Sequence, residues 1–296
     1  MRASHRAETL LLRATAGVLR ALPRPAAQGL GAALGSTVGA LGLRARVARD
    51  NLARAFPEHD AAWRARVLRE HYRELGRVAA DYARLPQLVH APRERVFAQW
   101  EGEQHAHAAR ALGRGVLFLT GHLGNFELYA AAFGRIMPMA ILVKPLSNPG
   151  ADAWLTALRT AAGLELLPTG PGVRAVVRRL RAGGCVALLG DQDARRDGVF
   201  VRFFGRLAST PAGPAWLSLA TGAPIVFGTC LRASDGRYAA RLHPPLLPEG
   251  DAGDAGAVRA LTARHAELLE HEVRERPESW FWLHRRWKTA APGAEA

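Results

Sequence analysis

Short apolar runs alternate with helix-like segments through the middle of the chain. The runs cover residues 116–120, 140–143, 164–167, 185–189 and 224–227. Helical periodicity fills the intervals at 125–134, 151–162, 173–182 and 212–221. Strands that are buried on both faces are apolar throughout, so this alternation predicts an α/β fold whose mostly parallel central sheet is flanked by helices. A polar antiparallel strand near 237–242 and a long helix near 256–274 are expected to complete the fold.

The first 45 residues have a helical pattern but differ from the rest in charge. Residues 25–43 contain no charged side chain, yet glycine and alanine dominate them and contribute little transfer free energy. A bilayer-spanning helix would be marginal here, and a segment held shallowly at the membrane surface is the alternative. The expected organisation is a membrane-associating helical segment (1–45), a globular domain (46–288) and a disordered tail (289–296).

The chain carries a large excess of positive charge. Its 296 residues include 40 Lys and Arg against 26 Asp and Glu, which gives a formal net charge of +14. Nucleic acid, an anionic membrane and an acidic protein are the partners that this charge suits. No zinc-finger spacing, RNP pattern or helix-turn-helix is found in the sequence, so nucleic acid is not predicted as a partner. A solvated, arginine-rich surface without a partner is the other interpretation.

Composition narrows the class of protein further. A content of 49% hydrophobic and 22% charged residues is typical of a globular domain, and the mean hydropathy of −0.06 argues against a polytopic membrane protein. The two cysteines, Cys185 and Cys230, both lie in apolar runs. Their position predicts buried thiols in a reducing compartment.

Candidate chemistry begins where the run 116–120 ends. His122 lies between two glycines, Asn125 is suited to cap a helix, and Glu127 would lie in the first turn of that helix. On one continuous helix the two ionisable side chains would point about 140° apart, so they can meet only if His122 is in the turn. A carboxylate against the imidazole would fix its tautomer and leave the other ring nitrogen to accept a proton from a hydroxyl. A loop histidine without a catalytic role is the alternative.

These residues resemble the bacterial lipid A biosynthesis (late lauroyl and myristoyl) acyltransferases, which are related to the glycerol-3-phosphate, lysophospholipid and mycobacterial phosphatidylinositol mannoside acyltransferases. The resemblance starts from the block His122-x4-Glu127 and covers residues 45–288. The other blocks are Asn-Leu-Ala-Arg-Ala-Phe-Pro at 51–57, Lys-Pro-Leu-Ser-Asn-Pro at 144–149, Gly-Asp-Gln-Asp at 190–193, Phe-Phe-Gly-Arg at 203–206 and His-Arg-Arg-Trp-Lys at 284–288.

The resemblance implies a glycerolipid acyltransferase-like fold and a specific reaction. A fatty acyl chain would pass from an acyl thioester, carried by acyl carrier protein or coenzyme A, to a hydroxyl of a glycolipid, with the lipid A precursor as the first candidate. His122 would be the general base and Glu127 its orienting carboxylate, with neither an acyl-enzyme nor a resident cofactor. Backbone N–H groups after Gly124 or the ammonium of Lys144, where many members carry arginine, would meet the developing oxyanion.

Further candidates for substrate binding lie at other strand ends and near the C-terminus. Asp191 and Asp193 either form hydrogen bonds to substrate groups or to Arg195 and Arg196, or they shape a turn. Asn148 either contacts substrate or caps the next helix, and capping is favoured. The complete set of substrate-binding candidates is Gly124, Asn125, Lys144, Asn148, Asp191, Asp193, Arg195 and Arg285.

No metal site is predicted from the sequence. His105 and His107 are two positions apart in a helical context, so they face different sides, and no cluster of Cys, Asp or Glu completes a ligand set.

The overall prediction is an O-acyltransferase at the cytoplasmic face of the inner membrane, held peripherally or by one N-terminal anchor. Its expected partners are a membrane lipid acceptor, acyl carrier protein and the anionic membrane surface. An enzyme for lysophospholipids or other glycolipids is the alternative within the same chemistry. A non-catalytic basic protein that binds membrane or nucleic acid is the alternative from a different class, and the intact pair of His122 and Glu127 counts against it.

Overall fold

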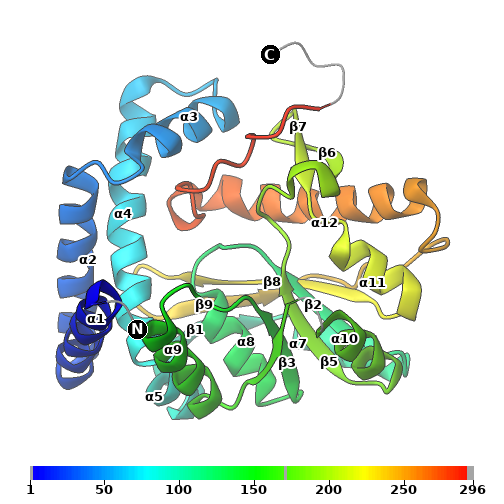
Figure 1. Ribbon diagram of the computed structural model, residues 1–296, viewed down its shortest axis with the longest axis horizontal. Coiled ribbons are helices and arrows are strands. Elements are labelled where there is room, and N and C mark those ends of the chain that lie inside the picture. Colours follow the sequence, from blue (N-terminus) through cyan, green and yellow to red (C-terminus); the bar gives the residue numbers. More distant parts are fainter. Residues whose placement is uncertain (1–2, 170–171, 292–296) are drawn as a thin grey trace.

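The computed structural model describes residues 3–169 and 172–291 and is built around a seven-stranded sheet in the order β1-β9-β8-β2-β5-β3-β4 (Figure 1). The strands are β1 (Phe97–Glu101), β2 (Val116–Thr120), β3 (Met139–Val143), β4 (Glu165–Pro168), β5 (Cys185–Leu189), β8 (Ile225–Arg232) and β9 (Tyr238–Leu242). Strands β8, β2, β5, β3 and β4 are parallel, whereas β9 pairs antiparallel with β8 and β1 pairs parallel with β9. The predicted α/β fold is confirmed.

Both faces of the sheet are buried, which explains why its central strands are mostly apolar. Leu117 and Leu119 of β2 join one hydrophobic cluster, and Val116 and Phe118 join the other. Helices on the first side are α10 (Gly172–Arg181), α11 (Gly213–Thr221) and α12 (Ala255–Glu275). Those on the second side are α5 (Leu85–His90), α7 (Glu103–Ala111), α8 (Phe126–Gly134) and α9 (Pro149–Ala161).

The sequence pattern missed two features of the sheet layer. Strand β1 is polar at its exposed edge, and the hairpin of β6 (Val199–Phe203) and β7 (Arg206–Thr210) forms a separate two-stranded sheet. In this hairpin Phe204 and Gly205 both have positive φ, of 52° and 70°. Such a left-handed turn is common at glycine but rare at phenylalanine, so residue type alone did not signal it.

Four helices form a layer at one end of the sheet (Figure 1): α1 (Ala3–Ala21), α2 (Arg24–Ala40), α3 (Ala45–Ala55) and α4 (Ala61–Ala83). The one-turn helix α6 (Arg93–Val96) leads into β1. Helices α2 and α4 touch backbone to backbone, because a Cβ at Gly76 would lie 1.9 Å from the carbonyl oxygen of Gly31. Three glycines of the uncharged segment 25–43, Gly31, Gly35 and Gly39, therefore serve helix packing. No helix of residues 3–169 and 172–291 combines the length and hydropathy needed to cross a bilayer.

The C-terminal segment after α12 is held over the sheet edge by the helical layer. Asn51 of α3 donates to the carbonyl oxygen of Trp282 at 2.7 Å, and His71 of α4 pairs with the carbonyl oxygen of Glu278, in the 3-10 turn η2 (Pro277–Ser279), at 3.0 Å. Residues 292–296 of the expected tail lie outside the described residues. Thr289, where that tail was expected to begin, donates to Asp193 at 3.0 Å.

Candidate active site

The carboxyl ends of β2 and β5 bring His122 and Asp191 together. These strands are parallel neighbours, so the residues that follow them meet at the same edge of the sheet. Nδ1 of His122 lies 2.7 Å from Oδ1 of Asp191, and the backbone N–H of His122 donates to Oδ2 at 2.8 Å. The indole N–H of Trp280 donates to the same oxygen at 2.9 Å. Three contacts therefore lock the carboxylate against the imidazole.

This arrangement sets the proton positions of the pair. Burial would lower the pKa of His122, but Asp191 and, more weakly, Glu127 raise it above its ordinary value. Burial would raise the pKa of Asp191, yet His122 and the indole of Trp280 lower it to about 2. With Asp191 ionised, Nδ1 carries the proton and Nε2 keeps its lone pair. The side-chain nitrogen of Gln192 lies 3.4 Å from that Nε2.

Glu127 lies in the first turn of α8 as expected, but its carboxylate does not hold His122. It is paired with Arg159 of α9, whose Nε lies 3.1 Å from both carboxylate oxygens and whose Nη2 contacts one of them. Glu127 is buried, and a guanidinium, which is always charged, stabilises a buried carboxylate better than an imidazole does. The expected direct contact with His122 is therefore wrong, and Asp191 occupies that position.

Backbone hydrogen bonds to two other segments of the chain hold the turn before α8. Gly124 has φ of 58°, and a Cβ there would lie 2.3 Å from the carbonyl oxygen of Cys230. The N–H of Gly124 donates to Ser279 and that of Asn125 donates to Cys230, both at 2.9 Å. Asn125 caps α8, because its side-chain oxygen accepts from the N–H of Leu128. These two backbone donors are engaged in the fold and cannot also serve an oxyanion.

Two candidates from the loop after β3 have different surroundings. Lys144 is exposed at the carboxyl end of β3, on the same sheet edge as His122. Asn148 caps α9 by accepting from the N–H of Gly150, and its amide also donates to Glu8 of α1 at 2.9 Å. The capping role of Asn148 is confirmed, and its amide groups face α1.

The remaining candidates divide into buried and exposed groups. Asp193 accepts from Thr289, and its backbone N–H donates to Nε2 of His284 at 2.9 Å. Arg195 and Arg285 are exposed, and no ion pair joins Arg195 to Asp191 or Asp193 among the contacts that the described chain makes. Of the alternatives for these aspartates, pairing with Arg195 or Arg196 is therefore not found among the described residues, and Asp191 is instead satisfied by three protein donors.

The sequence analysis did not single out Arg286, which lies near the site. Arg286 is buried beside Asp191 and Asp193 and donates to Thr210 and to the carbonyl of Ser209, both at 2.5 Å. Its neighbour Arg285 was singled out instead, since both belong to one run of cations and the sequence alone does not say which of them faces inward. Burial lowers the pKa of Arg286 to about 10, although the nearby aspartates oppose that shift.

The imidazole lies at a shallow, partly open position. Its side chain is 25% exposed, and the rings of Phe126 and Phe281 lie with centroids 5.3 and 6.1 Å from it. The site therefore consists of an open edge with aromatic walls.

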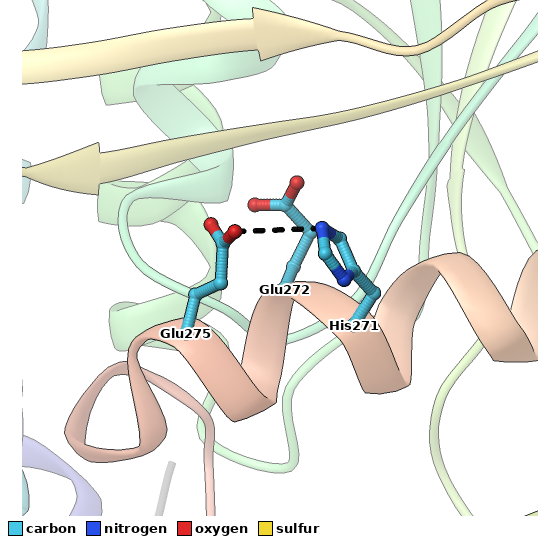
Figure 2. A group of neighbouring side chains, drawn as sticks. All are labelled: His271, Glu272 and Glu275. Atoms are coloured by element: carbon cyan, nitrogen blue, oxygen red, sulfur yellow. Dashed lines mark ion pairs between the residues drawn. The ribbon is translucent and has the colours of Figure 1, made fainter.

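A second group of ionisable side chains lies on α12, where His271, Glu272 and Glu275 gather their ligand-type atoms within 4.8 Å (Figure 2). The buried Glu272 is already bonded to Nε2 of His243 at 2.7 Å, and Arg241 lies 3.4 Å from both Glu272 and Glu275. Both carboxylates thus already have partners within the protein, and the group forms a polar network joining α12 to β9.

The chain is similar to known proteins over most of its length. A family model of bacterial lipid A biosynthesis acyltransferases matches residues 2–289. The lipid A biosynthesis palmitoleoyltransferase of Escherichia coli K12 is 28% identical over 268 residues, which cover 88% of this chain and 85% of the relative. The phosphatidylinositol mannoside acyltransferase of Mycolicibacterium smegmatis is 28% identical over 280 residues, covering 91% and 88%. The lipid A biosynthesis lauroyltransferase of Escherichia coli K12 is 27% identical over 280 residues, covering 92% and 88%. The predicted resemblance is confirmed: the chain belongs to the bacterial lipid A biosynthesis acyltransferase family and is an acyltransferase.

Proposed function

We propose that this acyltransferase moves a fatty acyl chain from an acyl thioester to a hydroxyl of a glycolipid, with His122 as the general base and Asp191 as the carboxylate that orients it. The observation that carries the proposal is the 2.7 Å contact between Nδ1 of His122 and Asp191, which leaves Nε2, with the amide nitrogen of Gln192 at 3.4 Å, as the ring nitrogen that can take a proton. Glu127 acts without contacting the imidazole: it forms an ion pair with Arg159, and its negative charge helps to raise the pKa of His122.

The reaction needs one proton acceptor and one oxyanion partner. The acceptor hydroxyl attacks the thioester carbonyl carbon while Nε2 of His122 takes its proton. The resulting imidazolium is stabilised by Asp191, and the tetrahedral intermediate then expels the thiolate, which receives that proton. Since the N–H groups of Gly124 and Asn125 are engaged, the ammonium of Lys144 and the amide of Gln192 are the proposed oxyanion partners.

The proposed acceptor is the lipid A precursor, and acyl carrier protein is the proposed donor. Relatives of this chain include both lipid A acyltransferases and phosphatidylinositol mannoside acyltransferases, so a different glycolipid or a lysophospholipid is the second candidate acceptor. The net charge of +14 would favour encounter with an acidic carrier protein.

Product analysis tests the proposal directly. The purified protein is incubated with acyl carrier protein thioesters of several chain lengths and total host lipids, and products are identified by mass spectrometry. We expect a glycolipid whose mass increases by one acyl chain, and no product from His122→Ala. Acylated lysophospholipid as the sole product would replace the proposed acceptor, and full activity of His122→Ala would refute the proposed base.

The proposed location is the cytoplasmic face of the inner membrane, reached through the outer faces of α1 and α2. On α1, Leu10, Leu11 and Val18 are exposed on one stripe, while Arg6 and Arg13 lie along its flank. An apolar stripe bordered by arginines is typical of a helix lying in the plane of a membrane interface. This supports peripheral attachment without a spanning segment.

A further inference from the structure

A cavity of about 1040 Å³ lies in the helical layer, between α2, α3 and α4. We call the small and apolar residues of its lining the floor and the arginines the rim; Ser36, Asp50 and Glu70 also line the cavity. The floor residues are Gly39, Ala40, Ala45, Ala53, Ala61, Ala65, Leu68 and Tyr72. The rim arginines are Arg49, Arg64, Arg66, Arg69 and Arg73. We call this cavity the arginine-rimmed groove.

Three of the rim guanidiniums are available to a ligand. Within residues 3–169 and 172–291, the side chains of Arg49, Arg66 and Arg69 form no hydrogen bond or ion pair, and all three residues are exposed. Of the other two, Arg64 is bonded to backbone carbonyls and Arg73 lies 3.6 Å from Glu70. The lining therefore carries five arginines against the two carboxylates of Asp50 and Glu70, so the groove has a net positive charge.

The groove is separate from the site at His122. Helix α4 forms its wall through Arg69, Tyr72 and Arg73, whereas the buried His71 of the same helix faces the other way and contacts Glu278 near the active site. A ligand in the groove therefore does not contact the imidazole, and occupation of the groove is a property distinct from acyl transfer.

We propose that the arginine-rimmed groove binds one molecule of an anionic phospholipid from the bilayer, with its phosphate among Arg49, Arg66 and Arg69 and its apolar part against the alanine floor. The combination of a cationic rim and an apolar floor matches the two ends of such a lipid. Helix α2, which supplies one wall, has no charged residue from 25 to 40 and exposes Leu30, Leu34 and Val38 on its outer side. These surroundings favour a lipid over an acidic protein helix, for which the rim would suffice and an apolar floor would not be needed.

Two variants separate a defined site from general attraction to negative charge. Arg66→Gln with Arg69→Gln removes two proposed phosphate contacts, and Ala65→Trp fills the floor without changing the net charge. All three positions are exposed, so these substitutions leave the core intact. The matched charge control is Arg110→Gln with Arg114→Gln, exposed residues at the opposite, amino end of β2.

Binding is measured by titrating the full chain with dihexanoyl phosphatidylglycerol below its micelle concentration, and by native mass spectrometry for stoichiometry. We expect one saturable site in the unchanged protein and in His122→Ala. The double Gln variant should weaken binding by about 10- to 30-fold, since each basic group near an anionic surface contributes about a fivefold factor. Ala65→Trp should abolish saturable binding, and the control pair should bind normally.

Three results would overturn the proposal. Equal losses in the double Gln variant and the control pair would reduce the effect to net charge, and unchanged binding by Ala65→Trp would exclude the groove floor. Binding of acyl carrier protein, but not of phosphatidylglycerol, that depends on Arg66 and Arg69 would identify an acidic protein as the occupant instead. The lipid-binding test does not depend on acyl transfer, because His122→Ala is expected to bind lipid as the unchanged protein does. Loss of the lipid-binding proposal would therefore not affect the proposed reaction, and loss of the proposed reaction would not affect the lipid-binding test.

Discussion

At the scale of single residues, the carboxylate of Asp191 determines both the proton position and the basicity of His122. The substitution Asp191→Asn removes the negative charge that raises the pKa of the imidazole. Only the neutral imidazole accepts a proton, so kcat/KM of the unchanged enzyme should rise with pH through that raised pKa. In Asp191→Asn the rise should move to lower pH, while the plateau falls by about 10³-fold or more because the tautomer is no longer fixed. A pH series of kcat/KM measures both effects.

A graded control for that prediction is Glu127→Gln. Glu127 contributes less than Asp191 to the raised pKa of His122 and does not contact the ring. The pH profile of Glu127→Gln should therefore shift in the same direction by a smaller amount. An Asp191→Asn profile whose limb stays at the position of the unchanged enzyme would show that this carboxylate does not govern the base.

The pair of Glu127 and Arg159 makes a separate prediction about stability. Glu127→Ala leaves the guanidinium of Arg159, whose side chain is only 16% exposed, without its partner. Breaking a buried ion pair on one side costs about 3–5 kcal/mol, so the midpoint of denaturant unfolding should fall markedly. The double variant Glu127→Leu with Arg159→Met should recover most of that loss, because no unpaired charge remains. If Glu127→Ala unfolds at the same denaturant concentration as the unchanged chain but transfers no acyl group, Glu127 acts in the reaction itself.

At the scale of elements, the sequence predicted the buried parallel strands well, because burial on both faces leaves continuous apolar runs. The run 116–120 coincides with β2, and 185–189 coincides with β5. Strand β1, with the sequence Phe-Ala-Gln-Trp-Glu, has only one buried residue, so no such signal exists for it. An edge strand such as β1 forms because it pairs with a strand elsewhere in the chain. The local pattern of apolar residues does not reveal that pairing.

The same limit explains what was missed at the site. His122 and Asp191 were each placed correctly at a strand end, but their contact depends on β2 lying next to β5, and strand order is not written in local patterns. The near neighbour in sequence, Glu127, therefore received the orienting role. The competing partner that draws Glu127 away, Arg159, belongs to α9 and had no motif of its own.

The close packing of α2 on α4 should be disrupted by the addition of a single methyl group. Gly76→Ala would place a Cβ 1.9 Å from the carbonyl oxygen of Gly31, so the two helices would have to separate. Overpacking of this kind typically costs about 1–3 kcal/mol, and it should expose the first 45 residues to limited proteolysis. Gly29→Ala is the matched control on α2, since nothing lies within 4 Å of its Cβ position. It should leave stability equal or slightly higher. Equal protease resistance of the two variants would show that this contact does not hold the layer together.

At the scale of the whole molecule, two forces would bring the protein to a membrane, and they differ in range. The net charge of +14 acts over about 10 Å at 0.1 M salt and is progressively screened above that. The apolar outer faces of α1 and α2 act only on contact, and salt does not weaken them. Electrostatic attraction of the protein to the membrane and its retention there by apolar contact can therefore be measured separately. The helical layer that holds the C-terminal segment over His122 is the same layer that would meet the lipid.

Flotation with vesicles containing anionic and neutral lipids tests this division. The unchanged protein should bind anionic vesicles at low salt and lose part of that binding between about 0.05 and 0.5 M salt, because the screening length falls to roughly 4 Å at the upper limit. Leu11→Ser with Leu41→Ser, two side chains 70% and 81% exposed, should weaken binding at every salt concentration by about tenfold or more, because each buried leucine contributes about 1.5–3 kcal/mol. Their match is Leu112→Ser with Leu247→Ser, two exposed leucines outside the helical layer, which should bind as the unchanged chain does. If both pairs lose binding equally, α1 and α2 do not form the membrane-facing surface, and if salt alone removes all binding, charge without apolar insertion accounts for the attachment.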